Sequence, residues 1–233
     1  MTAKKRIQLI DATRGLCVIL MVGHHFLYDL VVFLGAPAWL FSNPVLNSLH
    51  YFFAGMFIFL SGVSSRFSRS NLKRGVKVFL IAMVLSIVTW FMDMPIRFGV
   101  LHLLGFCMIF YGLTYKLWES FPAAVLPIFC SVLLFLTANL AGGVVSGTKF
   151  LWMFGWTYPG FYSSDYFPIF PWLFVFIFGT WAGKYIRDGR LPAWFYSVQV
   201  PLFPTVGQKA LLIYVLHQPV LYVITLFIKK LFT

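Results

Sequence analysis

Residues 11–29, DATRGLCVILMVGHHFLYD, open a long apolar segment that nevertheless carries five acidic, basic or histidine residues. An α-helix advances about 100° per residue, which places four of the five within a stripe roughly 60° wide: Asp11, Arg14, His25 and Asp29. His24 lies well off this stripe. The segment is therefore predicted to be a helix with one polar face.

The spacing along this helix predicts the depth of its histidine. Arg14 and His25 are eleven residues apart, which is about 16 Å along a helix axis. If Arg14 marks a membrane surface, His25 lies near the middle of a bilayer core about 30 Å thick. Ionisable groups at that depth are costly, and they normally face a protein interior or a water-filled cavity where they serve a function. The alternative is a tilted helix whose polar groups only satisfy one another inside a bundle.

The composition indicates an integral membrane protein. The chain has 233 residues, of which 61% are hydrophobic, 20% aromatic and only 10% charged. A soluble domain of this size could not bury so much apolar surface. In lipid a helix satisfies its own backbone hydrogen bonds, so we expect an all-α, polytopic transmembrane bundle. Its three cysteines lie within apolar segments and are interpreted as buried residues, with no disulfide framework and no metal site.

Seven apolar segments are candidates for membrane spans. The first is longer and more polar than the core of a cleaved signal peptide, so we expect it to be retained. No internal repeat or soluble region appears, and we interpret residues 1–233 as a single domain. The predicted spans are roughly 13–34, 48–64, 76–92, 99–117, 121–139, 168–186 and 208–228.

The basic residues predict the orientation, because cytoplasmic loops carry an excess of Lys and Arg. The net charge is +12, and with a cytoplasmic N-terminus 14 of the 18 basic residues fall on the inner side. Those are Lys4, Lys5, Arg6, Arg14, Arg66, Arg69, Lys73, Arg74, Lys77, Lys116, Lys184, Arg187, Arg190 and Lys209. This asymmetry explains the basic charge without nucleic acid. We expect an integral multi-pass protein, in the plasma membrane if the source is prokaryotic.

Two further polar stretches lie at the ends of predicted spans, one on the cytoplasmic side and one on the outer side. Ser61 and Gly62 end the second span, where small residues let helices approach closely. Arg66, Arg69, Lys73 and Arg74 follow at once and would suit an anionic cytosolic ligand such as a nucleotide, although ordinary inner-loop charge is the alternative. On the outer side, Arg97 and His102 open the fourth span. They are candidates for acceptor binding or proton handling, and a purely structural His102 is the alternative.

The last two spans carry the remaining polar candidates. Pro168 and Pro171 fix an irregular entry to the sixth span just before Trp172, which is useful where a backbone lines a cavity. Tyr214, His217 and Gln218 share one face of the last span, and His217 approaches the depth of His25. Two mid-depth histidines on different helices can converge. The aromatic connection 140–167 is interpreted as an interfacial belt, or alternatively as a lid over a sugar or lipid.

Together these pieces resemble a known family. The first-span pattern Asp11, Arg14, His25 and Asp29 is similar to that of transmembrane acyltransferases, and in particular of the heparan-alpha-glucosaminide N-acetyltransferase catalytic-domain family. Four further stretches match in order, namely 59–62, 99–102, 167–172 and 214–219. The resemblance covers nearly the whole chain. Larger members have about eleven spans, so this shorter chain leaves the acceptor open.

The resemblance implies transfer of an acetyl or other acyl group from cytosolic acyl-CoA, a co-substrate and not a permanently bound cofactor, to an amine or hydroxyl of a glycan or glycolipid. In this hypothesis His25 is the base and Asp29 orients it, while His217, Tyr214 or His102 stabilises the oxyanion. The donor would lie near Arg14, Ser61, Arg66, Arg69 and Arg74. The acceptor would lie near Arg97, Trp172, Tyr214 and Gln218. A homodimer is left open, and the lipid bilayer is the other expected partner.

Two other classes of protein fit the same residues. In a proton-coupled transporter or flippase, the polar stripe would be a proton or substrate path. Such proteins often contain internal repeats, and none is evident in this sequence. In a b-type haem protein, His25 and His217 would be axial ligands.

Overall fold

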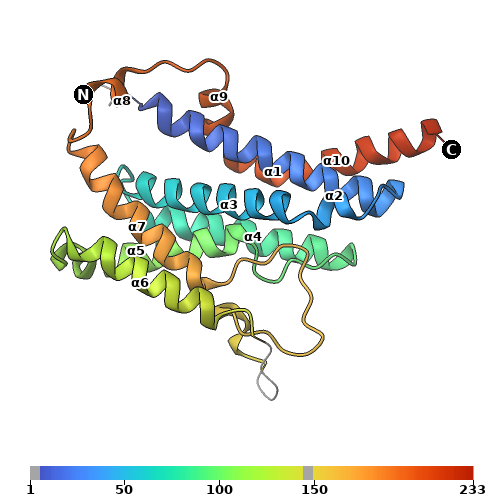
Figure 1. Cartoon of the computed structure of the whole chain (residues 1–233), viewed down its shortest axis with the longest axis horizontal. Helices are drawn as coiled ribbons and strands as arrows, with labels where there is room; N and C mark the ends of the chain where they lie inside the picture. The colour runs from blue at the N-terminus through green and yellow to red at the C-terminus, as the bar shows by residue number, and fades with distance from the viewer. Residues whose placement is uncertain (1–5, 144–148, 233) are drawn as a thin grey trace. The chain divides into compact units, whose positions relative to one another are not determined.

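The computed structural model describes residues 6–143 and 149–232. Within these ranges the chain forms helices joined by loops, and its one β feature is an isolated bridge between Phe98 and Tyr166. Figure 1 shows the helices in their order along the chain. The all-α prediction is confirmed.

The helix order follows the predicted spans closely. The elements are α1 (Gln8–Leu34), α2 (Trp39–Ser42), α3 (Pro44–Ser65), α4 (Asn71–Phe91), α5 (Val100–Ser120), α6 (Val125–Leu140), the 3₁₀ helix η1 (Leu151–Phe154), α7 (Ile169–Arg187), α8 (Ala193–Ser197), α9 (Phe203–Gln208) and α10 (Ala210–Phe232). Six helices in the described ranges are long and apolar enough to cross a membrane: α1, α3, α4, α5, α7 and α10. The remaining predicted span, 121–139, corresponds to α6, an apolar helix of only 16 residues. The multi-pass interpretation is confirmed, and the side on which the N-terminus lies remains a prediction.

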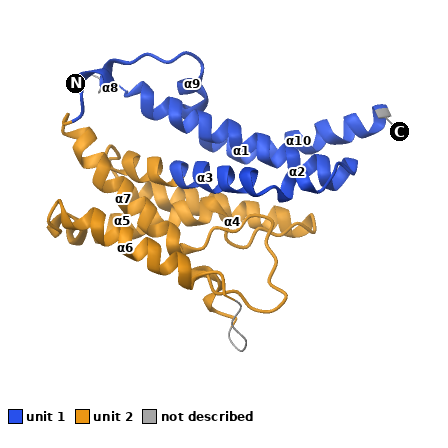
Figure 2. Ribbon diagram, viewed as in Figure 1, with its two compact units in different colours: residues 1–57, 191–233 blue, residues 58–190 orange. Residues whose placement is uncertain are grey.

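The chain divides into two compact units, coloured separately in Figure 2. Unit 1 comprises residues 1–57 and 191–233, and unit 2 comprises residues 58–190. Helix α3 belongs to both, because the division falls after Phe57. The single-domain assignment remains a prediction, since compact units of this kind occur both within one domain and in pairs of domains.

Unit 1 is built around α1, which packs against α9 and α10 (Figure 1). The contact with α9 depends on two glycines. A Cβ atom on Gly15 would overlap the carbonyl oxygen of Phe203, and one on Gly207 would overlap the carbonyl oxygen of Asp11. Only glycine lets the two backbones approach this closely. The polar stripe of α1 therefore starts at a tight helix contact.

Unit 2 contains the end of α3 with α4, α5, α6, η1 and α7. Helix α4 packs along α5, and α6 packs along α7. The predicted small-residue contact at Gly62 is present: a Cβ there would overlap the carbonyl oxygen of Phe176, and one on Gly179 would overlap that of Phe59. The end of α3 that is predicted to face the cytoplasm therefore packs closely against α7, as expected for a small residue at a helix interface.

Candidate active site

The polar faces of α1 and α10 meet within unit 1. Helix α1 contributes His25 and the fully buried Asp29, and α10 contributes His217 and Gln218. Buried Tyr214 precedes His217 by nearly one turn. The predicted convergence of the two mid-span histidines is confirmed.

The imidazole rings of His25 and His217, called here the imidazole pair, are in edge-to-face contact. Their ring centroids lie 4.8 Å apart with an angle of 81° between the planes. The Nδ1 atom of His25 lies 3.0 Å from the carbonyl oxygen of Met21, and that of His217 lies 2.6 Å from the carbonyl oxygen of Tyr214. A carbonyl oxygen only accepts, so each Nδ1 carries the proton and each neutral ring keeps its lone pair on Nε2.

Asp29 is completely buried, and its partner comes from the other helix. The side-chain amide of Gln218 donates a 2.9 Å hydrogen bond to Oδ1 of Asp29. The sequence pattern predicted that Asp29 orients His25, whereas in the structure the carboxylate accepts a hydrogen bond from Gln218. The assigned role of Asp29 remains a prediction.

Three buried acceptor atoms in this region have no hydrogen-bond partner among the described residues. They are Oδ2 of Asp29, Oε1 of Gln218 and Nε2 of His217. Buried polar atoms are normally paired, and each unpaired one calls for an explanation. Three acceptors together suit a ligand that donates hydrogen bonds, such as a hydroxyl-rich or amine-bearing molecule.

The first turns of α1 hold an ion pair. The guanidinium of Arg14 donates a 2.7 Å hydrogen bond to Asp11, and Arg6 lies 3.9 Å from the same carboxylate. Arg14 is mostly buried, whereas Arg6 is exposed. Arg14 and His25 thus occupy one polar face of α1 at different depths, as the stripe predicted, while a role for Arg14 in donor binding remains a prediction.

A second histidine contact was not predicted. His24 stacks on His50 of α3, with ring centroids 4.1 Å apart and planes inclined by 21°. We call these two residues the histidine stack. Their contact depends on how the chain turns through α2, which helical periodicity does not report. The only sequence signal is an isolated histidine in the second turn of an apolar helix.

His102 lies in unit 2, where both of its ring nitrogens are used. The backbone N–H of Gly99 donates to Nδ1 at 3.2 Å, which leaves Nε2–H to donate to the hydroxyl oxygen of Ser86 at 3.1 Å. Ser86 in turn donates to the carbonyl oxygen of Ile96. His102 therefore closes the first turn of α5 with no lone pair to spare, and its catalytic role remains a prediction.

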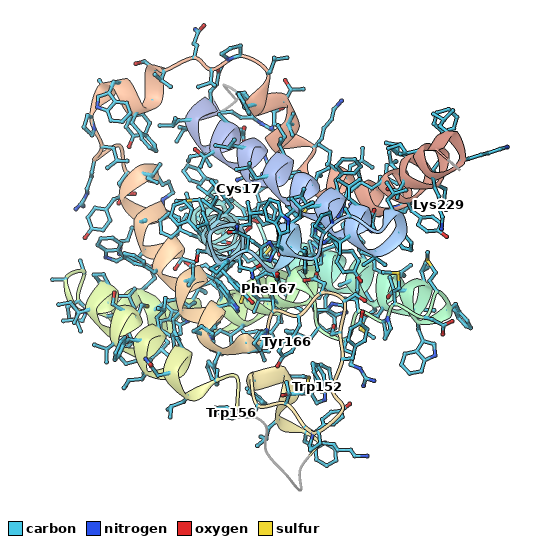
Figure 3. All side chains as sticks on the ribbon, turned by 45° about the vertical axis from the view of Figure 1, so that its right-hand side comes forward. Cys17, Trp152, Trp156, Tyr166, Phe167 and Lys229 are labelled. Carbon is cyan, nitrogen blue, oxygen red and sulfur yellow. The ribbon has the colours of Figure 1, made fainter. Side chains whose placement is uncertain are left out.

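Arg97 holds a loop of unit 2. Its side chain donates to the carbonyl oxygen of Tyr162 at 3.0 Å and to the hydroxyl of Tyr158 at 2.9 Å. In the same loop the hydroxyl of Tyr166 donates to the carbonyl oxygen of Trp152 at 2.5 Å. Figure 3 labels the side chains of both residues. Burial raises the pKa of Tyr166 to about 12. Residues 149–167 fit either interpretation of the connection 140–167, of which residues 144–148 lie outside the described part of the chain.

The other predicted binding residues of unit 2 fall into two groups. Arg66 pairs with Glu119 and donates to the carbonyl oxygen of Thr180 at 2.7 Å, while Lys184 lies 3.0 Å from the same carboxylate. The guanidinium of Arg66 is thereby committed to the protein. Ser61 is buried, Arg74 and Trp172 are partly buried, and Arg69 is exposed.

No group of three or more metal-binding side chains occurs in residues 6–143 and 149–232.

The family model described as heparan-alpha-glucosaminide N-acetyltransferase, catalytic, matches residues 6–219. The chain belongs to this family. The match includes the polar stripe of α1 and the first turns of α10, so the resemblance read from the motifs is confirmed. No curated protein and no solved structure matches the chain. Membership of the heparan-alpha-glucosaminide N-acetyltransferase catalytic family implies a membrane acetyltransferase.

Proposed function

We propose that this protein transfers an acetyl or other acyl group from cytosolic acyl-CoA to an amine or hydroxyl of a glycan or glycolipid at the membrane. The observation that carries the proposal is the imidazole pair beside the buried Asp29–Gln218 contact. It supplies a base, a second imidazole and three unpaired acceptor atoms in one unit of a chain that belongs to an acetyltransferase family.

The base is His25 in this mechanism. Its Nδ1–H is held by the carbonyl oxygen of Met21, so the lone pair on Nε2 is free of that contact and accepts the proton of the attacking amine or hydroxyl. Fixing one ring nitrogen sets the tautomer and the direction of the other. A histidine suits this role because its ordinary pKa lies close to neutral pH.

His217 supplies the complementary acid. As a neutral ring it accepts at Nε2, and only as an imidazolium does it donate to the oxyanion of the tetrahedral intermediate. Two positive charges on rings 4.8 Å apart repel each other, so the imidazole pair carries at most one extra proton during the reaction. One ring is then a base while the other is an acid.

The acceptor binds through its donors. Oδ2 of Asp29 and Oε1 of Gln218 accept hydrogen bonds from hydroxyl or ammonium groups next to the reacting atom. Because Gln218 uses its amide N–H on Asp29, the two side chains present a fixed pair of acceptors. An acceptor that lacks donors there leaves both atoms unpaired and binds poorly.

The donor side involves fewer residues than the sequence suggested. Arg66 is held by Glu119 and Thr180, so we assign the phosphates of CoA to the exposed Arg69 and its basic neighbours in the chain. Phosphate recognition by arginine and lysine is weakened by salt.

The geometry also bears on the haem alternative. Two axial imidazoles approach an iron from opposite faces of a porphyrin, whereas His25 and His217 contact each other edge to face. This arrangement argues against a bis-histidine haem.

Release of free thiol from acetyl-CoA by the purified protein tests the proposal. We expect release to rise when glycan or glycolipid acceptors are added, and mass spectrometry should find an acceptor heavier by one acetyl group. A protein that binds no acetyl-CoA at low salt and releases no thiol with any acceptor would contradict the proposal. A visible spectrum of the same sample reports any haem.

A further inference from the structure

The histidine stack lies next to the imidazole pair. His24 and His25 are consecutive residues of α1, and their ring centroids are 6.1 Å apart. The series His217, His25, His24 and His50 therefore places four imidazoles in a row, with centroid separations of 4.8, 6.1 and 4.1 Å. The proposed chemistry uses only the first two of them.

The ring of His24 carries a buried polar atom with no partner. Its Nε2 is buried and forms no hydrogen bond among the described residues. One face of the ring stacks on His50, and Phe41 of α2 lies 4.9 Å away. An unpaired buried nitrogen is unfavourable, so an apolar side chain would fill this space with a smaller free-energy penalty than a histidine does.

The stacked geometry excludes a shared metal ion. The lone pairs of an imidazole lie in the ring plane, and the planes of His24 and His50 are inclined by only 21°. Lone pairs that are confined to two separate, nearly parallel ring planes do not converge on one ion. The same geometry fits a proton, because a neutral ring can stack on a protonated one, whereas two protonated rings 4.1 Å apart repel. The histidine stack can therefore hold one proton but not two.

Acyl transfer to an amine produces such a proton. An ammonium acceptor loses two protons as the new C–N bond forms and the thioester C–S bond breaks. One of them ends on the departing thiolate, giving free CoA thiol, and the other is left over. Transfer to a hydroxyl leaves none, because the single O–H proton ends on the thiolate.

We propose that His24 and His50 form a proton relay. The relay takes the surplus proton from His25 and so returns His25 to its neutral form. This inference rests on the proposed acyl transfer and adds an amine as the acceptor. The proton passes from His25 to His24 and then to His50, with a water molecule bridging separations that are too long for direct hydrogen bonds. No bond other than N–H is made or broken in the relay.

Few titratable groups face the relay. On α1 they are His25 and Tyr28, on α3 the neighbouring Tyr51, and behind His25 lie His217 of α10 and Asp29. Helix α2 contributes the apolar ring of Phe41. The buried carboxylate of Asp29 lies on the His25 side, so the positive charge is favoured there and moves outward only as the relay gives it to water.

The test uses the whole purified protein with acetyl-CoA and two probe acceptors, methyl glucosaminide for the amine and methyl glucoside for the hydroxyl. His24→Gln and His50→Gln are expected to slow amine acetylation about tenfold, and added imidazole in the buffer should restore most of the rate. Phe41→Leu disturbs the same pocket without removing a proton carrier, so imidazole should not change its rate. The solvent deuterium isotope effect should rise in the two histidine variants only.

The outcomes separate the relay from the proposed function. Wild-type amine transfer in both histidine variants, or a loss that imidazole does not restore in monodisperse protein, would overturn the relay. Acetylation of methyl glucoside alone would also overturn it, because no surplus proton then forms, yet it would leave acyl transfer intact. If neither acceptor led to release of thiol and the protein bound no acetyl-CoA, the result would instead count against the proposed function.

Discussion

Gln218 of α10 donates a 2.9 Å hydrogen bond to Asp29 of α1, and the carboxylate that it reaches is completely buried. The two residues are 189 positions apart in the chain. This single contact links the first and last long helices of unit 1 next to the imidazole pair. It therefore couples the stability of the unit to the geometry of the proposed site.

Gln218→Leu should destabilise the protein by about 1.5–3 kcal/mol, because it removes a hydrogen bond to a charged group and leaves that group buried. Thermal or denaturant unfolding in detergent measures the loss. In an Asp29→Asn background the same change should cost less, since no buried charge remains to be compensated. Equal costs in both backgrounds would mean that the contact contributes nothing specific.

Arg66 and Arg69 should behave in opposite ways. Arg66→Met removes one of the two basic partners of Glu119, the other being Lys184, and should lower the free energy of unfolding by about 1.5–3 kcal/mol. Arg69→Ala alters an exposed side chain, so we expect unchanged stability and several-fold weaker binding of acetyl-CoA in calorimetry. An Arg66→Met protein of full stability that fails to bind acetyl-CoA would restore the assignment made from the sequence.

The orientation of the chain can be tested with an impermeant thiol reagent. Cys17, Cys107 and Cys130 are buried, so the natural cysteines should give little background. A Ser68→Cys variant should react only from the cytoplasm, because residues 65–75 carry part of the basic excess. Ser164→Cys, on an exposed position of the loop predicted to lie outside, is the matched control. Reaction of Ser68→Cys from outside would refute the predicted topology.

Much of the site on α1 and α10 could be predicted from the sequence, because it depends on local periodicity. A step of 100° per residue placed Arg14, His25 and Asp29 on one face. The position of His217 along the last span predicted a depth close to that of His25. Both follow from the regular turn and rise of an α-helix.

The remaining contacts depend on how distant segments pack. The pairing of Arg66 with Glu119 joins residues 53 positions apart, and no charge pattern distinguishes a paired arginine from one that awaits a phosphate. The stack of His24 on His50 depends on the turn through α2. His102 looked available because the sequence does not show that Gly99 and Ser86 occupy both of its nitrogens.

Tyr166 should give the protein a measurable dependence on alkaline pH. Burial raises its pKa from 10.0 to about 12, so its folded form resists ionisation more than its unfolded form does. The associated stability is fully present below pH 10 and is lost as the pH rises through 12. The difference in melting temperature between wild type and Tyr166→Phe should therefore shrink over this interval. A difference that stays constant would show that the phenol is not buried in solution.

The sharpest test of the site compares neighbouring histidines. His25→Ala should lower acyl transfer by about 10²–10⁴-fold, which is the range of a general base, while acetyl-CoA binding and monodispersity stay close to wild type. His24 lies off the polar stripe and serves only the relay, so its substitution should cost about tenfold, well below the loss at His25. The rates are to be measured with saturating acetyl-CoA on detergent-purified variants of equal monodispersity. If His25→Ala keeps more than about a tenth of the wild-type rate, or if His24 proves the more damaging position, then His25 is not the base.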